Sequence, residues 1–326
     1  MTSLIEQAAK RLEELRRAGI ETPVEHVSAY HGRSTETATP PTPEAIVRAL
    51  DGHGSTQPFA TVPRSLGKSR DAWGEGTGAD QAARRTEIDF ARLHARGFVT
   101  PDAGSTQIAE EFRVIKRPII RNALGPADAR VKHGNLVMIT SALPGEGKTF
   151  TSLNLALSIA SEVDSTVLLV DGDVAHPTIP GLLGAPHGPG LLDLLTSDDL
   201  RFADALVKTN IDKLSLLPAG SRHRRSTELL ASEQMASLLR DIGSRYPDRI
   251  IIFDSPPLLA TTEARVLAAN MGQIVMVVAA DATSQHAVSN ALATIEGCEI
   301  VMMVLNKASR TDVGNYYGYY PNDDAA

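Results

Sequence analysis

The stretch "LPGEGKT" at residues 143–149 has the residue types of a phosphate-binding loop. Gly145 and Gly147 let the backbone approach phosphate groups and aim N–H groups at them, and a helix start adds its positive dipole end. Lys148 can reach the β and γ phosphates, and the Thr149 hydroxyl can bind Mg²⁺. The strict pattern G-x-x-x-x-G-K-[ST] lacks its first glycine, because Ala142 stands there. We predict that a nucleotide is bound by Pro144, Gly145, Glu146, Gly147, Lys148, Thr149 and Phe150.

Carboxylates follow two apolar runs elsewhere in the chain. Asp171 and Asp173 come after "STVLLV" at 165–170, and Asp254 comes after "RIIIF" at 249–253. The carboxyl ends of parallel strands face the crevice where open α/β sheets bind ligands. There the aspartates could hold Mg²⁺ and its waters, or accept a proton from an attacking hydroxyl. The alternative is that Asp171 and Asp173 cap a helix, and an aspartate after an apolar strand is common in proteins.

Strand-like runs alternate with helix-like segments around these residues. The runs are continuously apolar, which indicates strands buried on both faces, and the helices between them indicate a parallel sheet with right-handed crossovers. A helix is also expected at 105–125, although Pro118 would kink or break it. The expected strands are "NLVMIT", "STVLLVD", "KLSLLP", "RIIIFD", "QIVMVVAA" and "EIVMMVLN", and the expected helices include "TFTSLNLALSIASE", "EQMASLLRDIGSRY" and "SQHAVSNALATIEG".

The composition changes on both sides of this region. Residues 1–20 have the spacing of an amphipathic helix, and residues 21–87 are dense in Pro, Gly, Ser and Thr, which is typical of a disordered tether. The helix either docks on a partner or is a dispensable appendage. An ordered domain is expected at 88–310, followed by a flexible tail at 311–326. That tail holds four of the six tyrosines in the chain, namely Tyr316, Tyr317, Tyr319 and Tyr320.

The bulk properties exclude several classes of protein. A formal charge of −7 argues against a bulk electrostatic grip on nucleic acid. A single cysteine, Cys298, excludes an internal disulfide framework. No apolar run approaches the roughly 20 residues that a bilayer-spanning helix needs. We therefore expect a cytoplasmic protein that is recruited to the inner face of the cell membrane only through a partner.

These motifs, in this order, resemble the Walker A, Walker A′ and Walker B motifs of the bacterial tyrosine kinases. Within that family the chain is most similar to the tyrosine autokinases associated with exosortase-type exopolysaccharide gene clusters. The resemblance covers residues 88–326 and includes "IAEEFRVIKR", "GPGLLDLL" and "LLPAGSRHRRSTELL". It implies a P-loop NTPase fold and ATP- and Mg²⁺-dependent phosphorylation of the C-terminal tyrosines in trans, between the subunits of a homo-oligomer.

The resemblance also implies roles for individual residues. Catalysis would rest on Lys148, Asp171 and Asp173, and the metal ligands would be Thr149, Asp171 and Asp254. Asn306 lies where related ATPases contact adenine, although a turn-forming asparagine is an equal alternative. The phosphoacceptors would be Tyr316, Tyr317, Tyr319 and Tyr320.

The chain departs from the family pattern in three respects. Ala175 replaces the arginine that often ends Walker A′, D-x-D-x-R. The subunit-contact pattern E-x-x-R-x-x-R appears as Glu110, Arg113 and Lys116, and lysine does not reproduce a bidentate arginine contact. A fused membrane-spanning activator is absent from the sequence, so a separate membrane chain-length-determinant protein is expected to activate the kinase.

Two other functions fit the same motifs. The first is an ATP-driven dimerisation switch, like the cell-division-site and plasmid-partition ATPases, in which no protein is phosphorylated. Those ATPases have an additional lysine early in the phosphate loop, where this chain has Leu143. The second is a nucleotide-bound regulatory scaffold with negligible turnover, which the alanine at position 175 favours.

Overall fold

The computed structural model describes residues 84–308, apart from positions 103, 105, 127, 129 and 247. The predicted N-terminal helix, most of the predicted tether and the tyrosine-rich tail lie outside the described residues.

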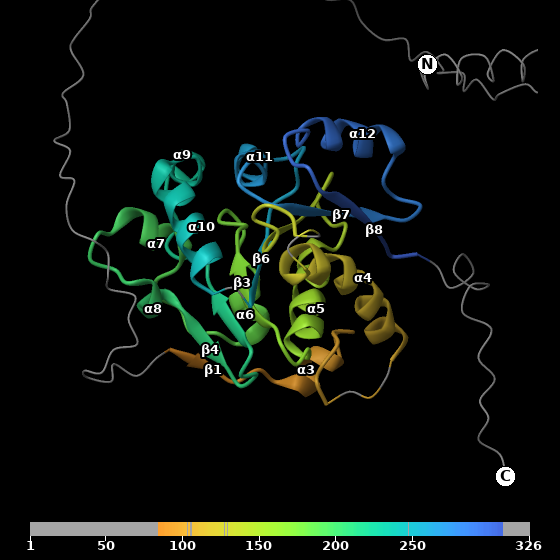
Figure 1. The fold of residues 1–326 in the computed structure, drawn as a ribbon, viewed down its shortest axis with the longest axis horizontal. Coiled ribbons are helices and arrows are strands. Elements are labelled where there is room, and N and C mark those ends of the chain that lie inside the picture. Colours follow the sequence, from red (N-terminus) through yellow and green to blue (C-terminus); the bar gives the residue numbers. More distant parts are fainter. Residues whose placement is uncertain are drawn as a thin grey trace, which may run out of the picture. The chain divides into compact units, whose positions relative to one another are not determined.

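The described residues form a single mixed sheet with the order β1-β4-β5-β3-β6-β2-β7-β8 (Figure 1). Every neighbouring pair of strands is parallel except β4 and β5, which are antiparallel. The predicted α/β fold with a mostly parallel sheet is therefore confirmed. The strands are β1 (Arg85–Thr86), β2 (Leu136–Ser141), β3 (Thr166–Asp171), β4 (Val207–Thr209), β5 (Leu214–Leu217), β6 (Arg249–Asp254), β7 (Gln273–Ala279) and β8 (Val301–Asn306).

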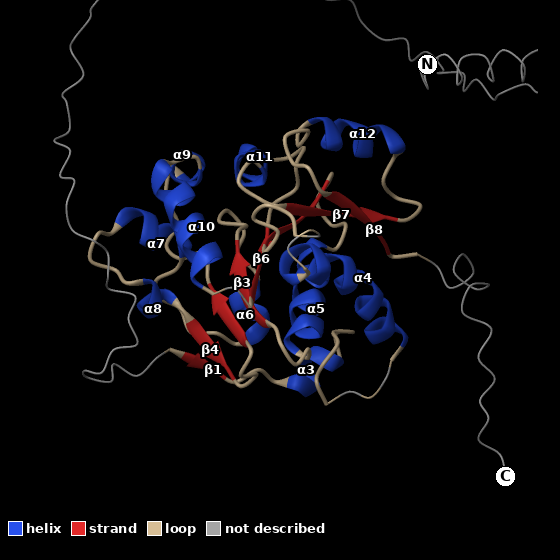
Figure 2. Ribbon diagram, viewed as in Figure 1, coloured by secondary structure: helices blue, strands red, loops and turns tan. Residues whose placement is uncertain are grey.

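Helices cover both faces of the sheet (Figure 2). One face carries α3 (Phe90–His94), α4 (Gln107–Leu124), α5 (Lys148–Ala160) and α6 (Ile179–Leu183). The other carries α7 (Leu191–Thr196), α8 (Phe202–Ala205), α9 (Ser226–Leu230), α10 (Glu233–Arg245), α11 (Thr262–Ala268) and α12 (Gln285–Ala293). None of the described helices is both long and apolar enough to cross a lipid bilayer.

The central strands have continuous apolar runs because each strand contributes to two cores. In β2, Leu136 and Met138 pack with the α7–α12 layer, whereas Val137 and Ile139 pack with the α3–α6 layer. Successive side chains of a strand point to opposite faces, so a strand that is covered on both faces must be apolar at every position. This sandwich fixes the carboxyl ends of β2, β3 and β6, where the site residues follow.

Three local features differ from the sequence-based predictions. Pro118 lies inside α4 without ending it. The short strand β4 was not predicted, because its exposed Lys208 interrupts the apolar run. Arg85 and Thr86 lie in the stretch predicted as tether, yet they pair with β4, so the ordered domain begins before residue 88.

Candidate active site

The phosphate loop joins β2 to α5 in the conformation that its glycines allow. Gly145 and Gly147 have φ angles of 81° and 102°, in the left-handed region that residues with a Cβ rarely adopt. A Cβ on Gly147 would also collide with the side chain of Asn306. Lys148 and Thr149 are the first residues of α5, so the N–H groups and dipole of the helix start face the same space.

Glu146 holds this loop in shape with its side chain. The side chain is buried, with 3% of the residue exposed. One carboxylate oxygen accepts from the Leu143 N–H at 2.6 Å, and the other accepts from the Ala279 N–H at 3.3 Å and from the Thr283 hydroxyl. Glu146 was predicted to bind the nucleotide, but its side chain is taken up by these contacts. Only its backbone could face a nucleotide.

The end of β8 is attached to the same loop. The Asn306 side-chain amide donates to the Glu146 carbonyl at 2.8 Å, and the Lys307 ammonium donates to the Gly145 carbonyl at 2.7 Å. Asn306 was predicted either to contact adenine or to form a turn. In the structure its Nδ2 binds the phosphate loop from the side.

The two remaining predicted loop residues lie in different surroundings. Pro144 is exposed at the tip of the loop. The ring of Phe150 instead packs in the α3–α6 core, with ring centroids 5.2 Å from Phe98 and 6.4 Å from Phe112. Phe150 therefore anchors the first turn of α5 and offers only its backbone N–H to a ligand.

Asp254 lies directly beneath the start of α5. Its Oδ2 accepts from the Thr149 hydroxyl at 2.7 Å, and its Oδ1 accepts from the Ser152 hydroxyl at 2.9 Å. The residue is 1% exposed, and burial raises the pKa of its carboxyl to about 6, against the lowering effect of the two hydroxyls and of Lys148. Ser152 escaped sequence prediction, although its position one turn after Thr149 puts it on the same helix face.

Asp171 lies opposite Asp254 in the register of the neighbouring strands β3 and β6. Its Oδ2 accepts from the N–H of Ile179, the first residue of α6, at 3.1 Å. Its Oδ1 is buried without a hydrogen-bond partner. Burial, with the nearby charge of Asp254, raises the pKa of Asp171 to about 8.

Asp173 is the more accessible member of the predicted carboxylate pair. Its side chain is 20% exposed, and its Oδ1 accepts from the His176 N–H at 3.0 Å. Ala175, at the position of the family's arginine, is exposed. The structure thus brings Lys148, Thr149 and the three aspartates to one edge of the sheet, whereas the four tail tyrosines lie outside the described residues.

The donor set of this edge fits Mg²⁺. Mg²⁺ is usually held by one or two carboxylates and completes its shell with water and substrate phosphates. A buried carboxylate oxygen without a partner, Asp171 Oδ1, is costly unless a cation or donor satisfies it. The hydroxyl of Thr149 and the carboxylates of Asp171 and Asp254 are the groups that would hold the ion. Among the described residues, no three His, Cys, Asp or Glu side chains form a metal-binding group on their own.

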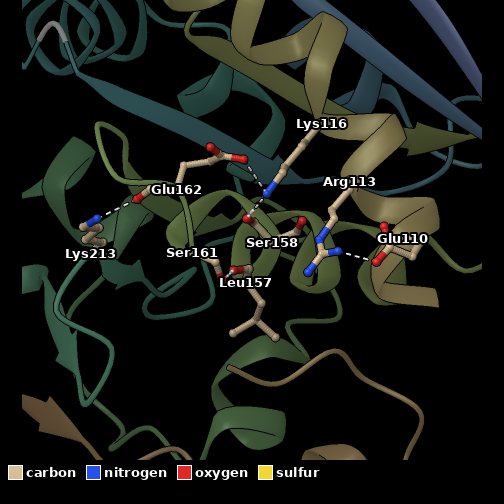
Figure 3. Close-up of polar contacts among 8 residues, drawn as sticks. All are labelled: Glu110, Arg113, Lys116, Leu157, Ser158, Ser161, Glu162 and Lys213. Atoms are coloured by element: carbon tan, nitrogen blue, oxygen red, sulfur yellow. Dashed lines mark hydrogen bonds and ion pairs between the residues drawn. The ribbon is translucent and has the colours of Figure 1, made fainter. Parts of the chain in front are cut away.

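The residues of the expected subunit-contact pattern lie on α4 and have different partners (Figure 3). Arg113 forms an exposed ion pair with Glu110. Lys116 is 4% exposed and points to the end of α5, where its ammonium donates to the Ser158 carbonyl at 2.6 Å and lies 2.7 Å from the Glu162 carboxylate. Lys116 therefore joins α4 to the end of α5 within one domain.

Residues 135–306, from the residue before β2 to the end of β8, match the AAA domain family. With the geometry above, this match defines the class of the protein as a P-loop nucleotide-binding protein. The chain is 30% identical over 224 residues to the putative tyrosine-protein kinase CapB of Staphylococcus aureus, covering 68% of this chain and 94% of CapB. It is 29% identical to the tyrosine-protein kinase YwqD of Bacillus subtilis, covering 66% and 87%. The chain belongs to the bacterial tyrosine kinase family.

Other members of this family are longer than this chain or have known structures. The match to the tyrosine-protein kinase Wzc of Salmonella typhimurium, at 32% identity, spans only 26% of that protein. Among solved structures, the chimerical protein CapA2B2 is 28% identical with a TM-score of 0.57, covering 68% of this chain and 93% of that one. The kinase domain of VpsO is 30% identical with a TM-score of 0.51, covering 63% and 100%.

Proposed function

We propose that this protein is an ATP-dependent protein-tyrosine autokinase that phosphorylates the tyrosine cluster at 316–320 of a neighbouring subunit. The observation that carries the proposal is the start of α5. There Lys148 and Thr149 adjoin a left-handed glycine loop, and the Thr149 hydroxyl is 2.7 Å from a buried aspartate. Phosphoryl transfer needs positioning and charge neutralisation more than covalent chemistry, and this arrangement supplies both.

The aspartates divide the remaining work according to their exposure. Asp171 and Asp254 are buried, so they suit the side of the metal that faces the protein. When Mg²⁺ is bound with ATP, it neutralises charge on the transferring phosphoryl group. Asp173 is the carboxylate that an incoming tyrosine hydroxyl can reach, so it accepts the phenolic proton or orients that hydroxyl.

Transfer between subunits fits the expected domain division. A tyrosine that serves as a substrate must leave its own domain and enter a neighbour's crevice, which a Gly- and Asn-spaced tail permits. We propose a homo-oligomer of unspecified size, in which the helix at 1–20 and the tether that precedes β1 lie outside the kinase domain.

The biological setting is proposed from the relatives. We propose the exosortase-associated subgroup as the nearest relatives and regulation of exopolysaccharide biosynthesis or export as the role. A separate membrane chain-length-determinant protein would act as activator and would bring the kinase to the inner face of the membrane. The solved chimera whose name joins CapA to CapB supports a partner encoded outside the kinase chain.

The test is incubation of the full chain with Mg²⁺ and ATP, followed by mapping of phosphate by mass spectrometry, with and without the co-expressed activator. Phosphotyrosine at 316–320 is expected. Its absence under both conditions would overturn the proposal, and ATP hydrolysis without phosphotyrosine would favour the dimerisation-switch ATPase instead.

Transfer in trans has its own test. A Lys148→Met chain keeps its tail but loses its catalytic lysine, and a chain with all four tail tyrosines changed to Phe keeps its active site. Mixing the two should label the Lys148→Met chain, whereas each alone stays unlabelled. An unlabelled Lys148→Met chain in this mixture, under conditions in which wild-type chains alone are labelled, would indicate transfer within one chain.

A further inference from the structure

Three arginines on the outer face of α4 are not absorbed by the proposed catalytic site. Arg113, Arg117 and Arg121 are spaced four residues apart, so they lie on one side of the helix, and all three are exposed. Lys116, between two of these arginines in the sequence, instead points inward to the end of α5 (Figure 3). We call these three residues the arginine face.

Two of these arginines flank a hollow in the surface. The hollow has a volume of about 450 Å³, and the described residues that line it are Arg117, Pro118, Ile120 and Arg121. Pro118 has no N–H to donate to the Val114 carbonyl one turn earlier, so that acceptor is left for another donor.

The guanidiniums beside this hollow have an acidic neighbour, Glu162, but no ion-pair partner among the described residues. Among the residues that the structure describes, the Arg117 and Arg121 guanidiniums form neither a hydrogen bond nor an ion pair. The hydrogen bond from Lys116 is the main cause of the lowered pKa of Glu162, and the nearby charge of Arg117 contributes to it. The hollow therefore combines two guanidiniums that have no hydrogen-bonded anion among the described residues with an apolar surface of proline and isoleucine.

The chemistry that fits such a hollow is a phosphate ester on an aromatic ring. Guanidinium binds phosphate oxygens in a bidentate fork and also stacks on aromatic rings. Successive positions at this spacing lie about 6 Å apart along the helix, which suits closely spaced phosphates. Proline and isoleucine side chains give the ring an apolar surface.

The chain contains one segment with that chemistry. Residues 309–326 hold the four clustered tyrosines together with Asp312, Asp323 and Asp324, against a single basic residue, Arg310. Each phosphate would add about −1.5 to −2 charges at pH 7. Before phosphorylation the segment is only weakly acidic, so its attraction to the arginine face depends on the modification.

We propose that the arginine face is a phosphotyrosine-binding site whose ligand is the phosphorylated 309–326 segment of the same chain. Tyr316 lies eight residues beyond Ala308, the last described residue, and so has a reach of about 26 Å. That reach compares with the roughly 27 Å length of an 18-residue helix such as α4. β8 and α4 also pack against the same core, through Met302, Val304, Ile115 and Ile120.

Docking within one chain gives the modification a consequence beyond charge repulsion. An intramolecular ligand on a short tether acts at an effective concentration of about a millimolar, so modest affinity is enough. The phosphorylated tail would occupy the arginine face and would at the same time be withheld from the neighbour's crevice. This inference rests on the proposed function only for the source of the phosphate.

A synthetic peptide separates the two ideas, because it does not require the protein to be a kinase. Binding of a fluorescent 309–326 peptide, phosphorylated at Tyr317 and Tyr319, is measured against the unphosphorylated peptide on the full chain with its own tail tyrosines changed to Phe. We expect the phosphorylated peptide to bind about tenfold tighter or more, and to weaken as salt is raised.

Substitutions locate the site. Arg117→Gln with Arg121→Gln should abolish the preference for the phosphorylated peptide. The matched control, Arg92→Gln with Arg96→Gln, removes two exposed arginines at the same spacing and should leave it unchanged. Equal binding of both peptides, or an unchanged preference in the Arg117/Arg121 variant, would overturn the proposal.

Two further measurements test the choice of ligand. If vesicles of anionic phospholipid compete with the phosphopeptide for wild type and lose binding in the Arg117/Arg121 variant, the face belongs to a lipid surface and the proposal fails. In the phosphorylated full chain, hydrogen exchange of α4 should slow equally at protein concentrations about tenfold apart, as intramolecular docking requires. Slowing only at the higher concentration would contradict docking within one chain.

Discussion

The two ends of α5 differ in the polar groups that surround them. At the carboxyl end, the Lys116 ammonium binds the Ser158 carbonyl, the Lys213 ammonium binds the Glu162 and Val163 carbonyls at 2.6 and 2.8 Å, and the Ser161 hydroxyl binds the Leu157 carbonyl. At the amino end, carboxylates are buried with raised pKa values.

The charged groups at the two ends of α5 have different effects on the fold. The carboxyl end places cations against the negative end of the helix dipole, which stabilises the fold. The amino end collects buried acidic groups, and one of their oxygens, Asp171 Oδ1, has no hydrogen-bond partner. Substitutions at the amino end should therefore lower activity without lowering stability, whereas substitutions at the carboxyl end should lower stability without lowering activity.

The largest effect is expected from Lys148→Met. Because this lysine is the cation nearest the expected phosphates, its loss should lower the rate of tyrosine phosphorylation by about 10²–10³-fold. The unfolding temperature should change little. Radiolabel transfer from ATP and thermal unfolding of the same sample measure the two quantities, and a variant that kept more than a third of its activity would contradict the assigned role.

Asp171→Asn should stabilise the protein while it removes activity. The pKa values of about 8 for Asp171 and about 6 for Asp254 lie above the usual carboxyl value, so the folded state retains protons that the unfolded state releases. Without metal and nucleotide, wild-type stability should fall as the pH rises from about 4 to about 8. The asparagine cannot ionise, so the variant should be more stable than wild type by roughly 5 kcal/mol at pH 8 and nearly equal at pH 4.

Thermal unfolding across this pH range, in buffer with a chelator, measures that gap. A gap that does not change with pH would show that Asp171 is ionised in the folded protein at all of these values. Saturating Mg²⁺ and ATP should narrow the gap, because a ligand that binds only the folded wild type adds to its stability.

Lys116→Met should lower stability and leave activity nearly unchanged. The substitution leaves the Ser158 carbonyl and the partly exposed Glu162 carboxylate without their cation, at a cost of about 2 kcal/mol. The unfolding temperature should drop by about 4–8 °C, while the activity of the folded fraction stays near the wild-type value. Lys213→Met is the matched comparison at the same helix end. Loss of activity without loss of stability in either variant would contradict the proposed difference between the two ends of α5.

The smallest effect is expected from Arg113→Ala. Its ion pair with Glu110 joins side chains that are 53% and 49% exposed, so water and salt screen it. We expect less than about 0.5 kcal/mol of destabilisation by chemical denaturation. A clear change in sedimentation without a change in stability would indicate that Arg113 contacts another subunit.

The sequence predicted what is contiguous and missed what is brought together by the fold. The phosphate loop and the apolar strands are continuous in sequence, so their types and order were accessible. The contact of Asn306 with Glu146 spans 160 positions and involves a turn-prone residue, so no local pattern indicated it. Lys116 was misleading for a related reason, because lysine is almost always exposed and nothing nearby in the sequence marks it as buried.

The attachment of β8 to the phosphate loop has a mechanical consequence. The chain leaves the described domain directly after Lys307, whose ammonium holds the Gly145 carbonyl, and after Asn306, which holds the Glu146 carbonyl. If a neighbouring subunit pulled on the tail, the force would act on these two hydrogen bonds before it reached any other part of the domain. Two hydrogen bonds at the end of β8 would therefore link a pull on the tail to the conformation of the phosphate loop.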